Sequence, residues 1–167
     1  ELQTQALEMS DAFNEEVVSF INNDPPIEGE PLTETQLAVI RMKSAEDMIV
    51  AQEHIDKGGD YKRAIDIYSQ ALIVDPENEE LKAALAEAEE LRYMTQERFS
   101  QVAKGMSEGE VRGLLGQPNL RNIREYPERN VVAWFYPTTE EGDAAAVWFR
   151  ANKAGDREVY QIKFEAI

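Results

Sequence analysis

The spacing of apolar residues changes near Arg98, and this change constrains the fold more than any other feature of the sequence. Before Arg98, apolar residues recur every three or four positions, as they do in amphipathic helices. After it, runs rich in β-branched and aromatic residues alternate with turn-forming residues, as they do in strands. The sequence therefore predicts an α+β protein, with an acidic all-helical segment at 1–97 and a small α+β domain at 98–167.

Four helices are expected in the first segment. We predict them over Leu2–Asn22, from Thr33 to Lys57, over Tyr61–Val74 and over Leu81–Tyr93. Thr33, with Gln36 three positions later, forms a capping box at the start of the second helix. Asp75 is expected to end the third helix and to cap the fourth, with Pro76 at the first helical position, where the missing N–H costs nothing.

The second segment is expected to contain two short helices and then three strands. Ser107 and Glu110 form another capping box, and that helix should end at Gly116 in the left-handed conformation, before Pro118. The strand-like runs are Val131–Tyr136, Ala145–Arg150 and Val159–Phe164. Turns between these runs predict a three-stranded antiparallel meander, which gives the domain the order ααβββ.

Alternation along the strands indicates which side chains face the helices. Val147 and Phe149 make the better inward pair, which turns Trp148 outward, although Trp148 could instead pack under the N-terminal helices. Two arrangements stay open for the preceding run, with either Trp134 and Tyr136 or Val131, Ala133 and Phe135 on the inner face.

The charge of the chain is concentrated in the first segment. The net charge is −16, and residues 1–97 carry 23 acidic and 7 basic side chains, whereas residues 98–167 carry 10 of each. The negative electrostatic field of this segment repels phosphate backbones, so nucleic acid is not expected as a partner. A basic protein surface is favoured instead. The alternative is a helical surface whose charge serves only solubility. The sequence also lacks a run of about 20 apolar residues, so no transmembrane segment is expected.

The sequence offers no recognisable catalytic or metal-binding pattern. There is no cysteine, and the single histidine, His54, has no second ligand at helical spacing. Neither a nucleophile elbow nor a phosphate-binding glycine loop is present. We therefore predict a protein that is not an enzyme and that uses no catalytic residues, metal or cofactor.

Residues 45–78 resemble a tetratricopeptide repeat. The resemblance is carried by Gly59-Asp60-Tyr61, Ala64, Tyr68, Ala71 and Pro76, which fall at the relative spacing of the second helix of that repeat. In such a repeat, small alanines let two helices approach closely and tyrosines fill the groove between them. One repeat is recognisable, so the flanking helices should act as caps.

About 60 residues of the second segment resemble the SmpA/OmlA lipoprotein domain, the fold of the smallest lipoprotein of the outer-membrane β-barrel assembly machinery. The resemblance is carried by Gly105-Met106-Ser107, Val111, Leu115-Gly116-Gln117-Pro118, Trp134, Tyr136 and Phe149. It implies a helix-plus-meander fold, a place in the bacterial envelope and a membrane tether in the native form.

The absence of catalytic patterns, together with the two resemblances, predicts a non-catalytic adaptor that binds a protein partner. We expect it to be exported, periplasmic or outer-membrane-associated. The alternative is a cytoplasmic regulatory or small-ligand-sensing module. The chain begins at Glu1, so either a signal peptide or a cloning boundary is expected upstream. The partner-binding candidates are Trp148, Trp134, Tyr136 and His54.

Overall fold

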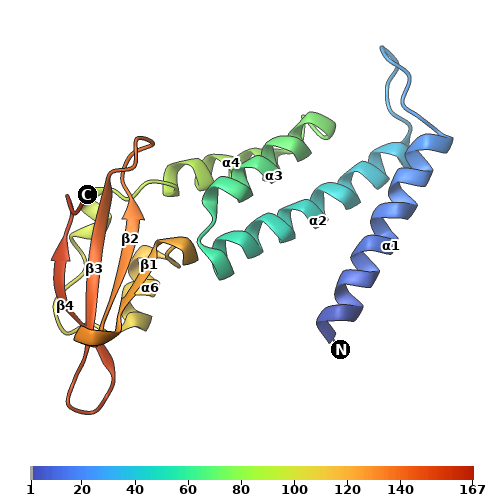
Figure 1. Ribbon diagram of the computed structural model, residues 1–167. Helices are drawn as coiled ribbons and strands as arrows, with labels where there is room; N and C mark the ends of the chain where they lie inside the picture. The colour runs from blue at the N-terminus through green and yellow to red at the C-terminus, as the bar shows by residue number, and fades with distance from the viewer. Residues whose placement is uncertain (1) are drawn as a thin grey trace.

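The chain forms a row of helices followed by an antiparallel sheet. The computed structural model describes the backbone of residues 2–167 and the side chains from residue 12 onward, so Glu1 lies outside the described residues. The helices are α1 (Leu2–Asn23), α2 (Glu34–Gly58), α3 (Tyr61–Val74), α4 (Glu79–Leu91), α5 (Gln96–Phe99) and α6 (Glu108–Leu115). The strands are β1 (Ile123–Tyr126), β2 (Val131–Pro137), β3 (Ala144–Ala151) and β4 (Arg157–Lys163). The sheet lies at one end of the molecule and α1 at the other, with α2, α3 and α4 between them (Figure 1).

Helices α2, α3 and α4 pack around small buried side chains. Ala51 of α2 and Ala64 of α3 are fully buried, which lets the two helix axes approach closely. Tyr68 and Leu81 fill the remaining space in the same cluster. The predicted bounds of α3 are confirmed, and the capping box of Thr33 is present at the start of α2.

The start of α4 was predicted wrongly. Asp75 ends α3, but α4 begins only at Glu79, where the side chain of Asn78 accepts hydrogen bonds from the N–H groups of Glu80 and Leu81. Asn78 in turn donates to the carboxylate of Asp75 at 2.8 Å. The residues after Asp75 therefore form a separate turn, because Asn78 satisfies the helix N-terminus that Asp75 was expected to cap.

Helix α1 contacts α2. Among the described side chains, Val17 of α1 and Ile40 of α2 are buried. The loop after α1 is held by the side chain of Gln36, which donates to the carbonyl of Asp24 at 3.1 Å. The N-terminal end of α1 lies well away from the sheet (Figure 1).

The sheet has four antiparallel strands in the order β1-β2-β3-β4, so the expected meander of three strands is one strand too short. The three predicted runs are strands β2, β3 and β4. The missing strand, β1, pairs with β2 along the edge of the sheet, with Ile123 opposite Trp134. It has only four residues, and Arg124 and Glu125 at its centre leave no apolar alternation to recognise.

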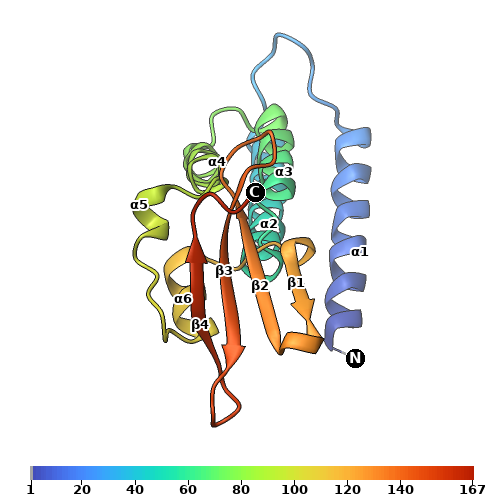
Figure 2. The same ribbon diagram turned by 60° about the vertical axis from the view of Figure 1, so that its left-hand side comes forward.

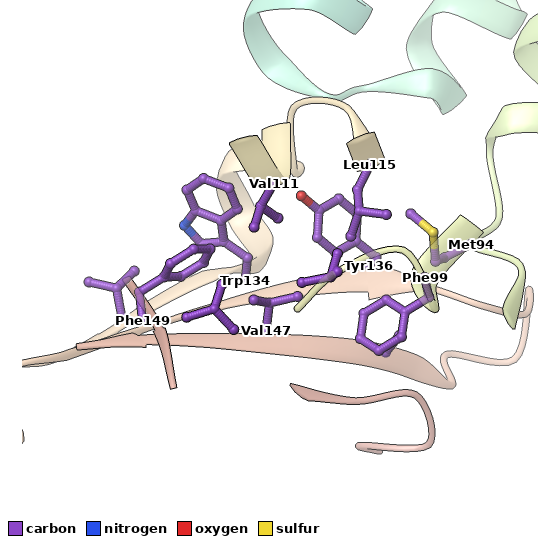
Figure 3. Packing of buried hydrophobic residues seen from close by; sticks show 12 residues of the cluster. Met94, Phe99, Val111, Leu115, Trp134, Tyr136, Val147 and Phe149 are labelled. Atoms are coloured by element: carbon purple, nitrogen blue, oxygen red, sulfur yellow. The ribbon is translucent and has the colours of Figure 1, made fainter. Parts of the chain in front are cut away.

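One face of the sheet forms the core of this domain together with α6. Val111 and Leu115 of α6 are buried against Trp134, Tyr136 and Phe149 in a single cluster (Figure 3). Trp134 and Tyr136 therefore face the helices, which decides between the two arrangements left open by the sequence. Val147 and Phe149 point inward as predicted, because both are fully buried in this cluster.

Helix α6 begins and ends at the residues that the sequence predicts, but Gly116 has ψ of 175° and so lies outside the left-handed helical region expected for it. The capping box of Ser107 and Glu110 is present, and Gly116 follows the last turn with φ of +84°. Pro118 is buried just beyond it. Among the described residues, no helix has the length and apolar character that a membrane span requires.

Candidate functional site

The face of the sheet opposite α6 carries aromatic side chains. Trp148 lies on this outer face because its neighbours Val147 and Phe149 point into the core. Its ring lies 6.1 Å from that of Phe135 in an edge-on contact that joins β3 to β2. Between these aromatic residues, Ala133 and Ala146 are fully buried, so the rings cover a floor of small side chains. In the described part of the chain no helix lies over this face (Figure 2).

Three strands add basic groups to the same face. Arg124 lies opposite Ala133, and Lys163 lies opposite Ala146, so both share the outer side. The guanidinium of Arg150 lies 4.1 Å from the centroid of the Tyr160 ring, an attractive cation–π contact. An irregularity between Trp148 and Phe149 changes the register with β4 at this point. We call Phe135, Trp148, Tyr160, Arg124, Arg150 and Lys163 the aromatic sheet face.

The four partner-binding candidates lie in different environments. Trp134 and Tyr136 are 2% and 5% exposed, so both are core residues in this conformation and lie out of reach of a partner. Trp148 is half-buried on the aromatic sheet face. His54 is half-buried in the last turns of α2, where its backbone carbonyl accepts the N–H of Asp60. The structure therefore does not bring these four residues together.

A second exposed surface runs along α2. Met42 and Ile49 are 57% and 65% exposed and lie seven residues apart, so they share one side of the helix. Ala38 and Ala45 are exposed on the same side. This apolar strip belongs to the segment that carries the surplus of acidic residues. We call Ala38, Met42, Ala45 and Ile49 the α2 strip.

A backbone hydrogen bond joins the helical segment to the sheet, and two side-chain bonds fix the end of α6. The N–H of Met94 donates to the carbonyl of Pro137 at 2.7 Å, which fixes the segment after α4 to the end of β2. Arg98 donates to the carbonyl of Leu115 at 3.2 Å, and the hydroxyl of Tyr136 donates to the carbonyl of Gly116 at 3.1 Å. The last two bonds hold the end of α6 against α5 and β2.

A cavity of about 280 Å³ lies at this junction. Its walls come from the first turn of α3, the end of α4, the loop after α6 and the β2–β3 hairpin. Apolar side chains such as Leu91, Met94 and Leu115 line it together with the amide side chains of Asn119 and Asn122. We call this space the junction cavity.

The phenol groups at the junction are held in their neutral form. Burial raises the pKa of Tyr61, and the carboxylates of Asp56 and Glu87 add to the rise while Arg98 opposes it. Burial also raises the pKa of Tyr136. A protonated phenol can donate a hydrogen bond, and the hydroxyl of Tyr136 does so to the carbonyl of Gly116. Within the described residues, no group of three or more acidic or histidine side chains is placed to hold a metal.

No protein-family model, curated protein or solved structure matches this chain. The resemblances to the tetratricopeptide repeat and to the SmpA/OmlA domain therefore rest on sequence motifs and remain predictions.

Sequence reasoning missed the junction cavity because its lining comes from segments far apart in the chain. The single available signal was Gly59, which the sequence marks only as part of a turn. The place of Arg124 on the sheet was not predicted, because β1 was not recognised as a strand.

Proposed function

We propose that this protein is a non-catalytic adaptor of the bacterial cell envelope that binds protein partners through two surfaces. The observation that carries this proposal is the aromatic sheet face, where Trp148 and Phe135 lie on the side of the sheet without a covering helix. Aromatic and arginine side chains are enriched at the centres of protein interfaces. The envelope location rests on the resemblance to the SmpA/OmlA domain.

The α2 strip supplies the second surface. Met42 and Ile49 give it apolar contact area, and the surrounding helical segment carries 23 of the 33 acidic residues of the chain. Like charges repel and opposite charges steer association, so the partner for this surface is a basic protein. The resemblance to a tetratricopeptide repeat supports the same role.

The bonds at the junction support an adaptor rather than two independent binding modules. The N–H of Met94 connects the segment after α4 to β2 through the carbonyl of Pro137, and Gly59 in the α2–α3 turn lies against the backbone of Gln117. The two surfaces are therefore held at a fixed distance and orientation. A partner bound at one surface would be presented at a defined position relative to a partner bound at the other.

Affinity capture from native envelope extracts at low salt tests the proposal. The bait proteins are the wild type, a sheet-face variant with Trp148→Ala and Arg150→Glu, and a strip variant with Met42→Ser and Ile49→Ser. We expect the wild type to retain specific proteins. Each of these proteins should fail to bind one of the two variants and still bind the other. The proteins that the strip variant fails to retain should be basic.

A matched control carries Glu141→Gln, in the exposed β2–β3 hairpin and outside both surfaces. It should retain the same proteins as the wild type. Identical retention by all four baits, or no specific retention by the wild type, would contradict the proposal. Fractionation of the native protein tests the location, because recovery in the cytosolic fraction alone would contradict an envelope role.

A further inference from the structure

We propose that the aromatic sheet face docks an acidic amphipathic helix of a partner protein. The apolar stripe of that helix lies on the aromatic rings, and acidic side chains on both sides of the stripe meet the basic groups of the face. This inference rests on the proposed adaptor role, because it names the kind of partner that one of the two surfaces takes. The α2 strip, on the acidic segment, takes a partner of the opposite charge.

The three rings of the face form a diagonal line across β2, β3 and β4. Phe135 pairs with Ala146, so Trp148 lies on the next strand, two residues further along. Tyr160 lies on β4 at the irregularity, next to Gln161, the partner of Trp148. Strands lie about 4.8 Å apart and alternate residues about 6.8 Å apart, so the line is about 14 Å long. This length matches the rise of about nine residues of an α-helix.

Cations lie on both sides of this line of rings. Arg124 on β1 and Arg150 on β3 lie on one side of it, and Lys163 on β4 lies on the other. A helix whose apolar stripe follows the line therefore turns the residues that flank its stripe toward cations on both sides. Complementary charge at these flanks favours Asp and Glu in the partner.

None of these three cations is neutralised by an ion pair within the described part of the chain, although the sequence holds 33 acidic residues. The salt bridges in that part involve other basic residues, namely Lys43, Lys57, Lys82 and Arg157. The three cations of the face are therefore available to carboxylates from outside the chain. Arg150 is also held in place by the ring of Tyr160, which leaves the edge of its guanidinium for a carboxylate.

Two carboxylates border the face and already accept hydrogen bonds. Glu158 lies opposite Arg150 and accepts from the side chain of Asn152 at 3.4 Å. Asp143 lies at the end of the face, where it lines a small cavity with Phe135 and accepts from a threonine hydroxyl. The three cations outnumber these two carboxylates, so the face carries an excess of positive charge in a chain whose net charge is −16.

The edges of the sheet disfavour the docking of an extended strand instead of a helix. Along β4, the carbonyl of Val159 accepts the N–H of Gly105, and its N–H donates to the carbonyl of Met106. At the other edge, β1 has only four residues, with Arg124 and Glu125 at its centre. Short and charged edges resist strand addition. A partner is therefore received on the face, and the element that ordinarily covers the face of a sheet is a helix.

Titration of the ¹⁵N-labelled full chain with synthetic peptides, followed by NMR, tests the proposal. The probes are acetylated and amidated peptides of about 18 residues, long enough to form a helix. Each has a stripe of leucine or phenylalanine flanked on both sides by glutamate. One comparison peptide has lysine in place of every glutamate, and another has the acidic composition scrambled so that the apolar residues share no face.

We expect at least one acidic amphipathic peptide to shift the indole N–H signal of Trp148 and to leave that of the buried Trp134 unchanged. The titration is done at about 0.15 M salt, where the charge of the distant helical segment is screened beyond about 8 Å. Both comparison peptides should bind at least about tenfold more weakly, because each loses either the charge pairs or the apolar stripe.

Variants locate the binding on the face. Arg124→Glu with Lys163→Glu reverses one cation on each side of the line of rings, so the lysine peptide should now bind more tightly than the acidic one. Arg63→Glu with Lys104→Glu changes the net charge equally at exposed positions outside the face, and should keep the preference for the acidic peptide. Trp148→Ala should weaken binding by about tenfold or more. Circular dichroism confirms that each variant is folded.

Three results would each overturn the proposal. They are the absence of a shift at Trp148 with either acidic peptide, binding of a comparison peptide as tight as that of the acidic one, and a preference that survives the reversal of Arg124 and Lys163. The adaptor role is tested separately by affinity capture. A captured protein that is lost from the sheet-face variant while no acidic peptide binds would leave the adaptor role standing and remove the acidic helix.

Discussion

Gly59, in the turn between α2 and α3, lies directly against the backbone of Gln117 in the loop after α6. A Cβ atom built on Gly59 would stand 2.3 Å from the carbonyl oxygen of Gln117 and 2.6 Å from the backbone nitrogen of Asn119. Gly59 also has φ of +59°, which few other residues adopt. The helices and the sheet domain therefore meet at a point where no side chain fits.

Gly59→Ala should destabilise the protein by about 2 kcal/mol or more, because it adds both backbone strain and a clash with backbone that cannot move aside cheaply. Urea denaturation measures the change. The matched control is Gly58→Ala, where the nearest atom to the new Cβ is the Asp60 Cβ at 3.9 Å. Gly58→Ala should be neutral or stabilising by up to about 1 kcal/mol, since Gly58 ends a helix. Equal stability of the two variants would contradict the close approach.

Tyr93→Phe should stabilise the protein by about 1 kcal/mol, because it removes a buried hydroxyl that has no partner among the described residues. Tyr136→Phe should have the opposite sign and cost about 1 kcal/mol, because it leaves the carbonyl of Gly116 without its donor. Thermal denaturation of the two variants beside the wild type measures both effects. A loss of stability in Tyr93→Phe would show that its hydroxyl has a partner in the protein.

The two tryptophans should differ sharply in their contribution to stability. Trp134→Ala should cost about 3–5 kcal/mol, since its ring is buried and packs 4.5 Å from that of Phe149. Trp148→Ala should cost only about 1 kcal/mol, the scale of its edge-on contact with Phe135. Chemical denaturation decides between these values. A large loss in Trp148→Ala would mean that Trp148 serves the fold rather than a partner.

The stability of α6 should depend on acid pH through Glu110. The backbone N–H and the hydroxyl of Ser107 donate to its carboxylate at 2.8 and 2.9 Å, which holds the pKa of Glu110 below its ordinary value of 4.5. A lowered pKa means that the stabilisation is fully present above the ordinary value and is lost as the pH falls through the folded-state value. The advantage of the wild type over Glu110→Gln should therefore shrink below pH 4.5.

NMR titration of the Glu110 carboxyl checks the direction of the pKa change directly, and Ser107→Ala should return that pKa toward its ordinary value. Glu89→Gln on α4 controls for the general loss of one negative charge. A difference between the wild type and Glu110→Gln that stays the same at acid and neutral pH would contradict the role of the capping box.

Local patterns predicted most of the elements. The Thr33 and Ser107 capping boxes fix two helix starts through neighbours three residues away, so the sequence alone is sufficient there. Where two residues compete for one cap, as Asp75 and Asn78 do, local rules do not decide. The orientation of Trp148 was also predictable. Side chains alternate between the two faces of a strand, so a residue between two inward-facing neighbours points to the outer face.

The junction could not be predicted, because its contacts join distant segments. Gly59 and Gln117 are far apart in the chain, and neither residue signals the other. Edge strand β1 was not predicted for a different reason. Its one core residue, Ile123, gives no periodicity, and its pairing with β2 decides its conformation.

The backbone contact at Gly59 limits how this architecture can be recombined. Replacing residues 1–97 with another helical hairpin would require a glycine of the same conformation at the same place in the turn, facing a loop of the same path. Chimeras joined near Arg98 should therefore fail unless both sides of the contact are transferred together. Any homologue that keeps this arrangement should retain glycine here even where the rest of the helical surface diverges.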